Sequence, residues 1–440
     1  MASTVRTATM RFTAAPLLVL ALFGAMLTAA PAQADELRNR EYWLEDYGIT
    51  KAWQSSKGAG VKVAVIDSGV DASHPDLAGA VVGGTDVSGA GSPDGTKGVG
   101  KEPAHGTLVA SLLAGRGNGG APGDSPKPDG VVGVAPEAEL LTVSTWLGSP
   151  NPAGKSIDEQ IPAAVRWAVD NGAKVINMSL SSSSTIWPQS WDDAFLYAEQ
   201  RDVVIIAAAG NSGSGQGQVG APATIPGVVA VAGLNRAGEV SQSSSTPGIT
   251  IAVSAAAEKL VGALPGNAYA DWDGSSGAAP IVAGVAALIR SKYPSMTAVQ
   301  VINRIILTAK PKGDPVPNNL YGWGVVDADA ALNAVVPLAT VNPLFKLTGS
   351  LQDWITVHRR ADAPPPTQAP EPSAPATPTP TVPPPTTPVA LPPSELDSGL
   401  PAALVLGFGA LLLLVVLGGT LHLLLLRRRF KAEEASGNTS

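Results

Sequence analysis

The segment VKVAVIDSGV, residues 61–70, decides the fold class of this 440-residue chain. Its apolar residues run on to Ile66 and stop at Asp67, a pattern typical of a strand buried on both faces of a parallel sheet. Open α/β sheets place their functional sites at the carboxyl ends of such strands. We therefore expect the Asp67 carboxylate to emerge at a functional edge, although an aspartate after a strand is by itself more often a cap or turn residue.

The rest of the chain, up to about residue 345, alternates between strand-like and helix-like runs. This alternation is the βαβ signature of a parallel sheet with helices on both faces. The region is also long enough to bury one large core, so we predict a single α/β domain at 61–345. The strand-like runs lie at 61–66, 139–143, 174–178, 203–207 and 228–232, and the helix-like runs at 108–114, 158–170, 190–199 and 278–292.

A histidine suited to act as a base follows the first strand. His105 begins the segment HGTLVASLLAG, whose apolar positions fit a helix. The chain has three other histidines: His74 in the turn-like segment ASHPDL, His358 beside a proline-rich tract, and His422 within an apolar run. His105 is therefore the best candidate base.

A candidate nucleophile lies in the segment GSSGAAP at 274–280. Gly274 and Gly277 permit a tight turn around Ser276, and an apolar helix-like run follows, so the Ser276 hydroxyl is expected at a helix N-terminus. A serine, a histidine and an aspartate are the groups that nucleophilic acyl transfer requires, and here they occur in the order Asp, His, Ser.

The chain resembles the subtilase superfamily of serine proteases and, within it, the mycosins, which are membrane-anchored subtilisin-like proteases associated with type VII secretion in actinobacteria. The resemblance runs from about residue 38 to about residue 334. It implies a subtilisin-like fold and endopeptidase activity, with Asp67, His105 and Ser276 as the catalytic triad. The matching segments are YWLEDYGITKAW, VAVIDSGVDASHPDL, HGTLVAS, GVVGVAP, VINMSL, AAAGN, GSSGAAP and YGWGVVDADAAL.

The resemblance also implies an oxyanion donor. Asn211 ends the segment AAAGN and matches the superfamily's oxyanion asparagine, which acts together with the backbone N–H of Ser276. Taken alone, an asparagine after Gly210 is more often a turn residue. Ser275 and Gly277 replace the commoner threonine and a larger apolar residue, which predicts looser packing around the nucleophile and low activity.

Substrate contacts are implied at Ser179, Leu180 and Ser181, which follow VINM. In subtilases this segment pairs with the substrate backbone and borders the primary specificity pocket. Ser181 stands where glycine is more usual, which predicts a narrower pocket. A solvated serine-rich loop explains residues 179–184 about as well.

The two ends of the chain carry export and membrane signals. Two arginines, an apolar stretch and the sequence Ala-Gln-Ala predict a signal peptide at 1–34, and a short membrane helix is the alternative. The uncharged run 400–426 is long enough to span a bilayer, and a buried core helix is the weaker interpretation. Basic residues directly follow it, so the tail 427–440 is expected in the cytoplasm and the enzyme domain outside.

Two connecting segments complete the predicted organisation. The extension at 35–60 is too short for a separately folded inhibitory domain and is expected to pack along the enzyme domain through Tyr42, Trp43 and Tyr47. A linker is predicted at 346–399, because 14 of the 30 residues from 364 to 393 are proline, a composition that favours an extended stalk.

Composition restricts the partners and cofactors. The chain has no cysteine, so no disulfide stabilises it, whereas mycosins often carry them. A net charge of −7 argues against nucleic-acid binding. We expect protein or peptide substrates, a membrane and, from the resemblance, the type VII secretion complex as partners. We expect no cofactor and no metal, because the acidic residues of two glycine-rich loops lack calcium-site spacing. Those residues are Asp86, Asp94, Asp124 and Asp129.

Two other functions stay open from the sequence. The chain could serve mainly as a structural component of the secretion complex, with weak or dispensable proteolysis, because it carries an anchor and a stalk. It could also be a generic surface protease unrelated to secretion.

Overall fold

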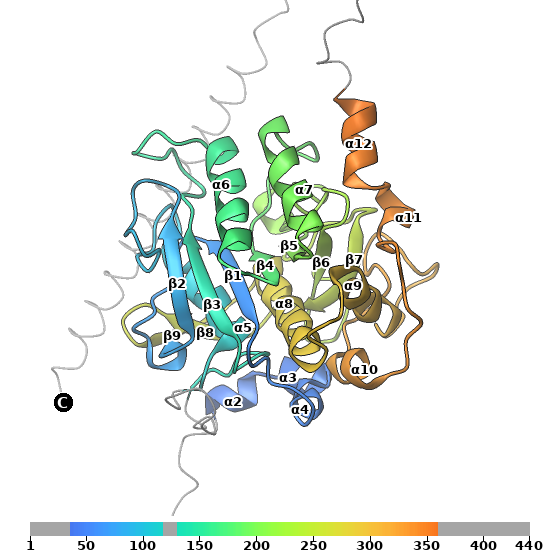
Figure 1. Cartoon of the computed structure of the whole chain (residues 1–440). Coiled ribbons are helices and arrows are strands. Elements are labelled where there is room, and N and C mark those ends of the chain that lie inside the picture. The colour runs from blue at the N-terminus through green and yellow to red at the C-terminus, as the bar shows by residue number, and fades with distance from the viewer. Residues whose placement is uncertain (1–35, 118–129, 360–440) are drawn as a thin grey trace, which may run out of the picture. The chain divides into compact units, whose positions relative to one another are not determined.

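A seven-stranded parallel sheet organises the protein (Figure 1). The computed structural model describes residues 36–117 and 130–359. The strand order is β2-β3-β1-β4-β5-β6-β7, so the α/β parallel sheet expected from the sequence is confirmed. The strands are β1 (Lys62–Asp67), β2 (Val81–Asp86), β3 (Glu139–Ser144), β4 (Val175–Met178), β5 (Val204–Ala208), β6 (Val229–Leu234) and β7 (Ile251–Ala256).

The sheet separates two cores, because successive side chains of a strand point to opposite faces. In β1, Val63 and Val65 belong to one core, whereas Ala64 and Ile66 belong to the other. The first core lies under α5 (His105–Ala114) and α8 (Ser275–Lys292), and the second under α6 (Ile157–Asp170) and α7 (Asp192–Gln200), as Figure 1 shows.

Helix α8 is buried almost all round, which explains its composition. Fifteen of its residues are buried and its first two turns hold only small residues apart from Ile281 and Val282, so neighbouring strands approach it closely. It contacts β4, β5, β6 and β7 along its length. Helix α6 is amphipathic instead and begins with a capping box in which Glu159 accepts the Ser156 N–H at 2.8 Å.

Four strands were not expected from the sequence: β2, β7 and the two strands of a hairpin. Strand β2 contains two adjacent glycines and a register shift between Val81 and Gly83, and glycines weaken a strand pattern. Strand β7 is alanine-rich, and alanine is uncommon in strands, which leaves its type ambiguous. The antiparallel hairpin of β8 (Leu260–Leu264) and β9 (Ala268–Trp272) packs against α5 rather than joining the main sheet.

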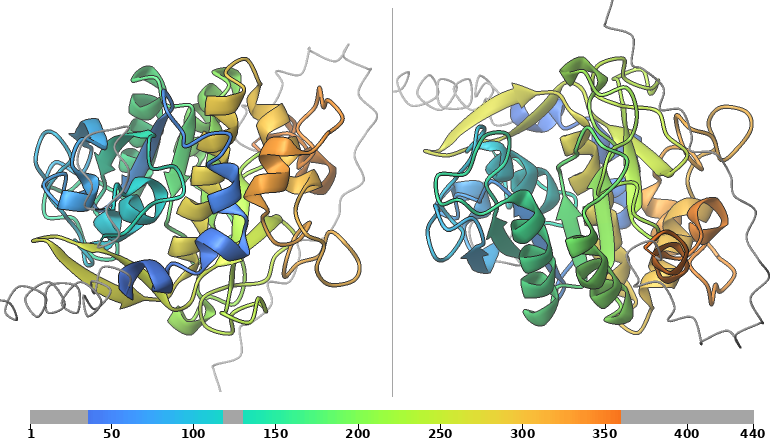
Figure 2. Two further views of the ribbon diagram at one scale, coloured as in Figure 1. Left: turned by 90° about the horizontal axis from the view of Figure 1, so that it is seen from below. Right: turned by 90° about the horizontal axis from the view of Figure 1, so that it is seen from above.

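The N-terminal segment packs along the domain, as the sequence predicted. It forms α2 (Glu36–Arg40), α3 (Trp43–Asp46) and α4 (Ile49–Ala52), which Figure 2 shows in blue. Helix α2 contacts β8, and α4 contacts α10 (Ala328–Asn333). Trp43 is fully buried, Tyr42 and Tyr47 are nearly so, and the Tyr42 hydroxyl donates to the Glu258 carbonyl at 2.7 Å.

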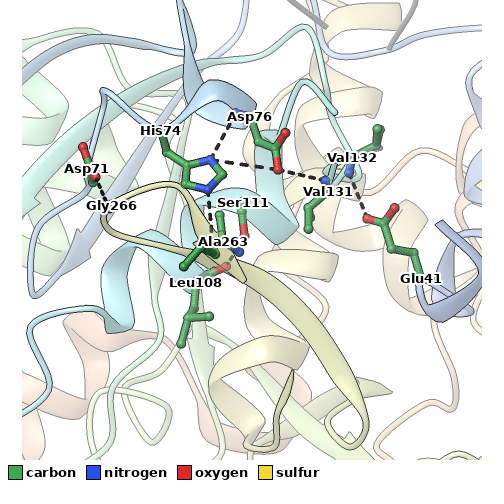
Figure 3. A network of polar contacts seen from close by, with 12 residues as sticks. Glu41, Asp71, His74, Asp76, Leu108, Ser111, Val131, Val132, Ala263 and Gly266 are labelled. Atoms are coloured by element: carbon green, nitrogen blue, oxygen red, sulfur yellow. Dashed lines mark hydrogen bonds and ion pairs between the residues drawn. The ribbon is translucent and has the colours of Figure 1, made fainter. Parts of the chain in front are cut away.

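Buried carboxyl groups fasten this segment to the chain beyond it (Figure 3). Glu41 Oε1 accepts the Val132 N–H at 2.9 Å, and Arg38 Nε lies 3.0 Å from Glu41 Oε2. Burial raises the pKa of Glu41 to about 8, although the Arg38 charge and the Val132 hydrogen bond lower it.

Next to it, Asp76 Oδ2 accepts the Val131 N–H at 2.9 Å, and the Asp76 N–H donates to His74 Nδ1 at 3.1 Å (Figure 3). His74 Nε2 lies 3.2 Å from the Ala268 carbonyl oxygen, so this histidine joins the hairpin to the domain.

The two chain ends that flank residues 118–129 are paired with each other in a short neck. Arg116 and Val132 form an antiparallel bridge, and the Gly117 N–H donates to the Val131 carbonyl at 2.9 Å. Together with the bonds from Val131 to Asp76 and from Val132 to Glu41, these contacts fix both ends of that segment to the domain.

The folded domain continues past residue 345, where the sequence placed its end. After α9 (Ala298–Leu307) and α10 come α11 (Phe345–Thr348) and α12 (Leu351–His358), and Leu351 is buried in the second core. The predicted boundary at 346 therefore places the start of the linker too early. Its boundary was inferred from composition, and the apolar residues of α12 precede the proline-rich stretch.

A cluster of side chains, called here the α12 clasp, holds α12 on α7. The rings of Trp354 and Trp187 lie 4.1 Å apart between centroids. Arg359 Nε lies 2.8 Å from Asp192 Oδ2, and this ion pair is largely buried. The Trp187 indole also donates to Asp192 at 2.6 Å, so the clasp consists of Trp187, Asp192, Trp354 and Arg359.

Within residues 36–117 and 130–359, we find no helix with both the length and the apolar character that a bilayer crossing requires. The predicted signal peptide at 1–34 and the predicted membrane span at 400–426 lie outside the described residues.

Candidate active site

Strand ends and helix starts meet at one edge of the main sheet, because parallel strands end on the same side. Asp67 is the last residue of β1, Ser179 follows β4, and Asn211 follows β5. His105 begins α5 and Ser276 is in the first turn of α8. All five residues line a cleft of about 880 Å³, so the structure brings the predicted site residues together.

Asp67 and His105 form a hydrogen-bonded pair that lines the cleft. His105 Nδ1 is 2.8 Å from Asp67 Oδ1, which also accepts the Ser68 N–H at 2.7 Å. The buried carboxylate places the ring proton on Nδ1 and leaves Nε2 as the accepting nitrogen. Burial, the largest influence, lowers the pKa of His105, but the charge and hydrogen bond of Asp67, together with Glu102, raise it overall above its ordinary value.

The candidate nucleophile is hydrogen-bonded to the strand end beside it. Ser276 Oγ donates to the Ser179 carbonyl at 3.1 Å, and Ser179 Oγ donates to the Ser276 carbonyl at 2.7 Å. Among the described contacts, no hydrogen bond joins Ser276 to His105. Such bonds are often formed only when substrate is present.

The adjacent Ser275 is engaged elsewhere, which distinguishes the two serines. Its side chain is buried, accepts the Gly210 N–H at 3.1 Å and donates to Asn211 Oδ1 at 3.0 Å. Ser276 is the serine of this pair whose hydroxyl remains available to the cleft.

Asn211 is oriented by its contacts with α8. Its Oδ1 accepts both the Ser275 N–H at 2.9 Å and the Ser275 hydroxyl, so the side-chain oxygen caps the start of this helix. The Nδ2 group makes no hydrogen bond to the part of the chain that the structure describes. Asn211 lines the cleft, so this residue has an unused donor at the site.

The expectation of loose packing around the nucleophile is wrong. A Cβ added at Gly277 would lie 2.1 Å from Leu260 Cδ1 and 3.3 Å from the Trp272 ring. Leu260 and Trp272 therefore occupy the space that a larger side chain would need. Trp272 also contacts the His105 ring edge to face, with centroids 6.0 Å apart, so the hairpin packs against His105 as well.

The predicted substrate segment forms one wall of the cleft. Ser179, Leu180 and Ser181 all line it. A further residue, Gln216, was missed from the sequence: its Oε1 accepts the Asn211 N–H at 2.7 Å and its Nε2 donates to the Ser182 carbonyl at 2.8 Å. No local pattern marks Gln216, because its second partner lies 34 residues away.

The acidic residues weighed as calcium ligands are engaged in loop contacts where they are described. Asp86 Oδ1 accepts the Ser144 and Ser88 hydroxyls, both at 2.6 Å. Residues 36–117 and 130–359 contain no group of three or more His, Asp or Glu side chains placed to hold a metal ion. Asp124 and Asp129 lie outside this part of the chain.

Comparison with known proteins agrees with this geometry. Residues 58–324 match the family model described as the Subtilase family. Subtilisin DY of Bacillus licheniformis is 39% identical over 286 residues, which are 63% of this chain and 93% of that protein.

The solved structures that resemble the protein include the mycosins MycP1 and MycP3. MycP1 with its N-terminal propeptide removed has a TM-score of 0.56 at 29% identity, over 68% of this chain and 98% of that chain. The MycP3 protease from the type VII (ESX-3) secretion system has a TM-score of 0.53 at 33% identity, over 67% of this chain and 88% of that chain. The resemblance read from the sequence is therefore confirmed, and the chain belongs to the subtilase family of serine peptidases.

Proposed function

We propose that this protein is a serine endopeptidase in which Ser276 is the nucleophile, His105 the general base and Asp67 the residue that orients the base. The observation that carries the proposal is the 2.8 Å contact between His105 Nδ1 and Asp67 Oδ1, in a cleft that Ser276 and Asn211 also line. In the reaction, His105 Nε2 takes the Ser276 proton as Oγ attacks a peptide carbonyl, and an acyl-enzyme forms and is hydrolysed.

The developing oxyanion is stabilised by two donors, Asn211 Nδ2 and the backbone N–H of Ser276. The hydrogen bonds that hold Asn211 Oδ1 on Ser275 support this role, because they fix the amide before substrate arrives. Before attack, the Ser276 hydroxyl exchanges its bond to the Ser179 carbonyl for one to His105.

Labelling with a fluorophosphonate tests the nucleophile. The native chain should be labelled, Ser276→Ala should not, and Ser275→Ala should keep its label on Ser276, because the Ser275 hydroxyl is engaged with Gly210 and Asn211. Labelling that survives Ser276→Ala would refute the assignment.

We further propose that the protein is anchored in the cell membrane by residues 400–426, with the domain outside and the tail 427–440 in the cytoplasm, and that it acts with a type VII secretion complex. The charge pattern around 400–426 supports the topology. The likeness to MycP3, a protease from a type VII secretion system, supports the association. Protease added to intact cells should cut within 364–393 and release the domain, whereas a cytoplasmic location of the domain would contradict the topology.

A mainly structural role in the secretion complex is the second candidate. It is favoured by the predicted anchor at 400–426 and the proline-rich stretch at 364–393, which a freely acting protease does not need. Export of secretion substrates by Ser276→Ala and by a deletion of 400–426 distinguishes the roles. A structural role predicts normal export in the first and failure in the second. Failure of Ser276→Ala at normal protein level would make proteolysis essential, and normal export in the deletion would indicate a protease independent of the secretion complex.

A further inference from the structure

The side-chain amide of Gln216 connects two walls of the cleft. Its Oε1 accepts the Asn211 N–H at 2.7 Å, and its Nε2 donates to the Ser182 carbonyl at 2.8 Å. The same Nε2 lies 3.4 Å from Ser181 Oγ. Both ends of the amide are thus hydrogen-bonded, one to the segment after β5 and the other to the segment after β4.

The proposed reaction places a substrate side chain next to Gln216. A carbonyl attacked by Ser276 with its oxygen at Asn211 Nδ2 belongs to the residue before the scissile bond, called P1. The P1 side chain branches from the atom next to that carbonyl, so it must project between segments 179–182 and 208–211. Gln216 lines the cleft between these two segments.

Two glycines pack closely against the residues that the Gln216 amide joins. A Cβ added at Gly210 would lie 2.4 Å from Gln216 Oε1 and 3.1 Å from Ser181 Oγ. A Cβ added at Gly220 would lie 1.8 Å from the Ser182 carbonyl oxygen and 3.0 Å from Ser181 Oγ. The backbone at Gly210 therefore lies against the Gln216 amide, and the backbone at Gly220 lies against the Ser182 carbonyl that this amide binds.

We propose that Gln216 closes the P1 pocket and restricts cleavage to positions after small residues, namely glycine, alanine or serine. The inference rests on the proposed serine endopeptidase function. A large P1 side chain enters only if the amide leaves, and that leaves the Asn211 N–H and the Ser182 carbonyl without their partners. Because Asn211 carries the oxyanion donor, the displacement also disturbs the residue that stabilises the transition state.

The test uses the purified full-length chain in detergent and two fluorogenic peptides that differ only in having alanine or phenylalanine at P1. The native chain should show kcat/KM at least 10-fold higher for the alanine peptide. Gln216→Ala should raise kcat/KM for the phenylalanine peptide at least 10-fold and reverse the preference. Gln218→Ala is the matched control, since Gln218 lies in the same loop, is exposed and does not line the cleft, and it should keep the native ratio.

A binding measurement keeps the inference separate from catalysis. In the Ser276→Ala background, product peptides ending in alanine should bind more tightly than those ending in phenylalanine, and Gln216→Ala should reverse this order. If Gln216 only stabilised its loop, its substitution would weaken both peptides alike, and an unchanged ratio in either assay overturns the inference. Absence of any Ser276-dependent hydrolysis would instead overturn the proposed function, while the binding ratio would still decide the role of Gln216.

Discussion

Replacing Asn211 by aspartate or by alanine separates two functions of one side chain. Oδ1 accepts the Ser275 N–H and hydroxyl at the start of α8, whereas Nδ2 is the proposed oxyanion donor. Asn211→Asp keeps an acceptor for Ser275 and removes the donor. Asn211→Ala removes both groups.

The expected sizes of the two effects differ. Loss of one oxyanion donor lowers kcat by about 10²–10³, the magnitude known for a subtilisin and applied here to a relative of that enzyme. Loss of a cap at a helix start lowers the free energy of unfolding by about 1 kcal/mol. In a domain of roughly 300 residues this corresponds to about 1–2 °C in Tm. The donor therefore governs the rate and the acceptor governs the stability.

The outcomes follow for each variant. Asn211→Ala should lose about 10²–10³ in kcat and about 1–2 °C in Tm, with little change in KM. Asn211→Asp should keep its Tm and lose at least as much kcat, because a carboxylate beside the oxyanion adds like-charge repulsion.

Steady-state kinetics on a peptide substrate and calorimetric melting of the same preparations measure both quantities. A native kcat in Asn211→Asp would refute the donor role. A lower Tm in Asn211→Asp than in Asn211→Ala would refute the cap. An effect on KM alone would reduce Asn211 to a turn residue.

Four further outcomes are expected. The pKa of His105 is raised above 6.5 and the base must be neutral, so kcat/KM should fall as the pH drops through a value above 6.5. Asp67→Asn should shift this acidic side of the pH–rate profile to lower pH, and an unchanged profile contradicts the pairing of His105 with Asp67. Folded Glu41 keeps its proton up to about pH 8, whereas the unfolded chain releases it near pH 4.5. The free energy of unfolding, measured by urea titration, should therefore decrease as the pH rises from 4.5 to about 8, and Glu41→Gln should make this decrease smaller. Trp43→Ala should cost about 3–5 kcal/mol in the same titrations, and a loss below 1 kcal/mol would show that the N-terminal segment unfolds separately. Arg359→Ala should speed amide hydrogen exchange in α12 and leave kcat unchanged, and unaltered exchange would exclude a role for the α12 clasp.

The sequence predicted those parts of the site that local pattern determines. Asp67 ends an apolar strand, while His105 and Ser276 begin helices, and each such position is visible in a few neighbouring residues. Because parallel strands share one edge, the convergence of these groups follows from the fold class.

What the sequence could not predict depends on distant partners. Gly277 is required by Leu260 and Trp272, which reach it from another element, so its replacement of a larger residue was misread as looseness. Gln216 is positioned by its hydrogen bond to the Ser182 carbonyl, which follows a different strand. Helix α12 was missed because the boundary was predicted from the proline-rich composition of the segment that follows. The actual end of the fold is determined by the packing of α12 on α7, which composition does not reveal.

The neck formed by Arg116, Gly117, Val131 and Val132 has a consequence for engineering. Its two ends are bonded to each other and to Glu41 and Asp76, so these contacts hold both ends in place on the domain. The position between 117 and 130 is therefore a natural point at which to splice in an epitope or a fluorescent reporter, far in sequence from both chain ends.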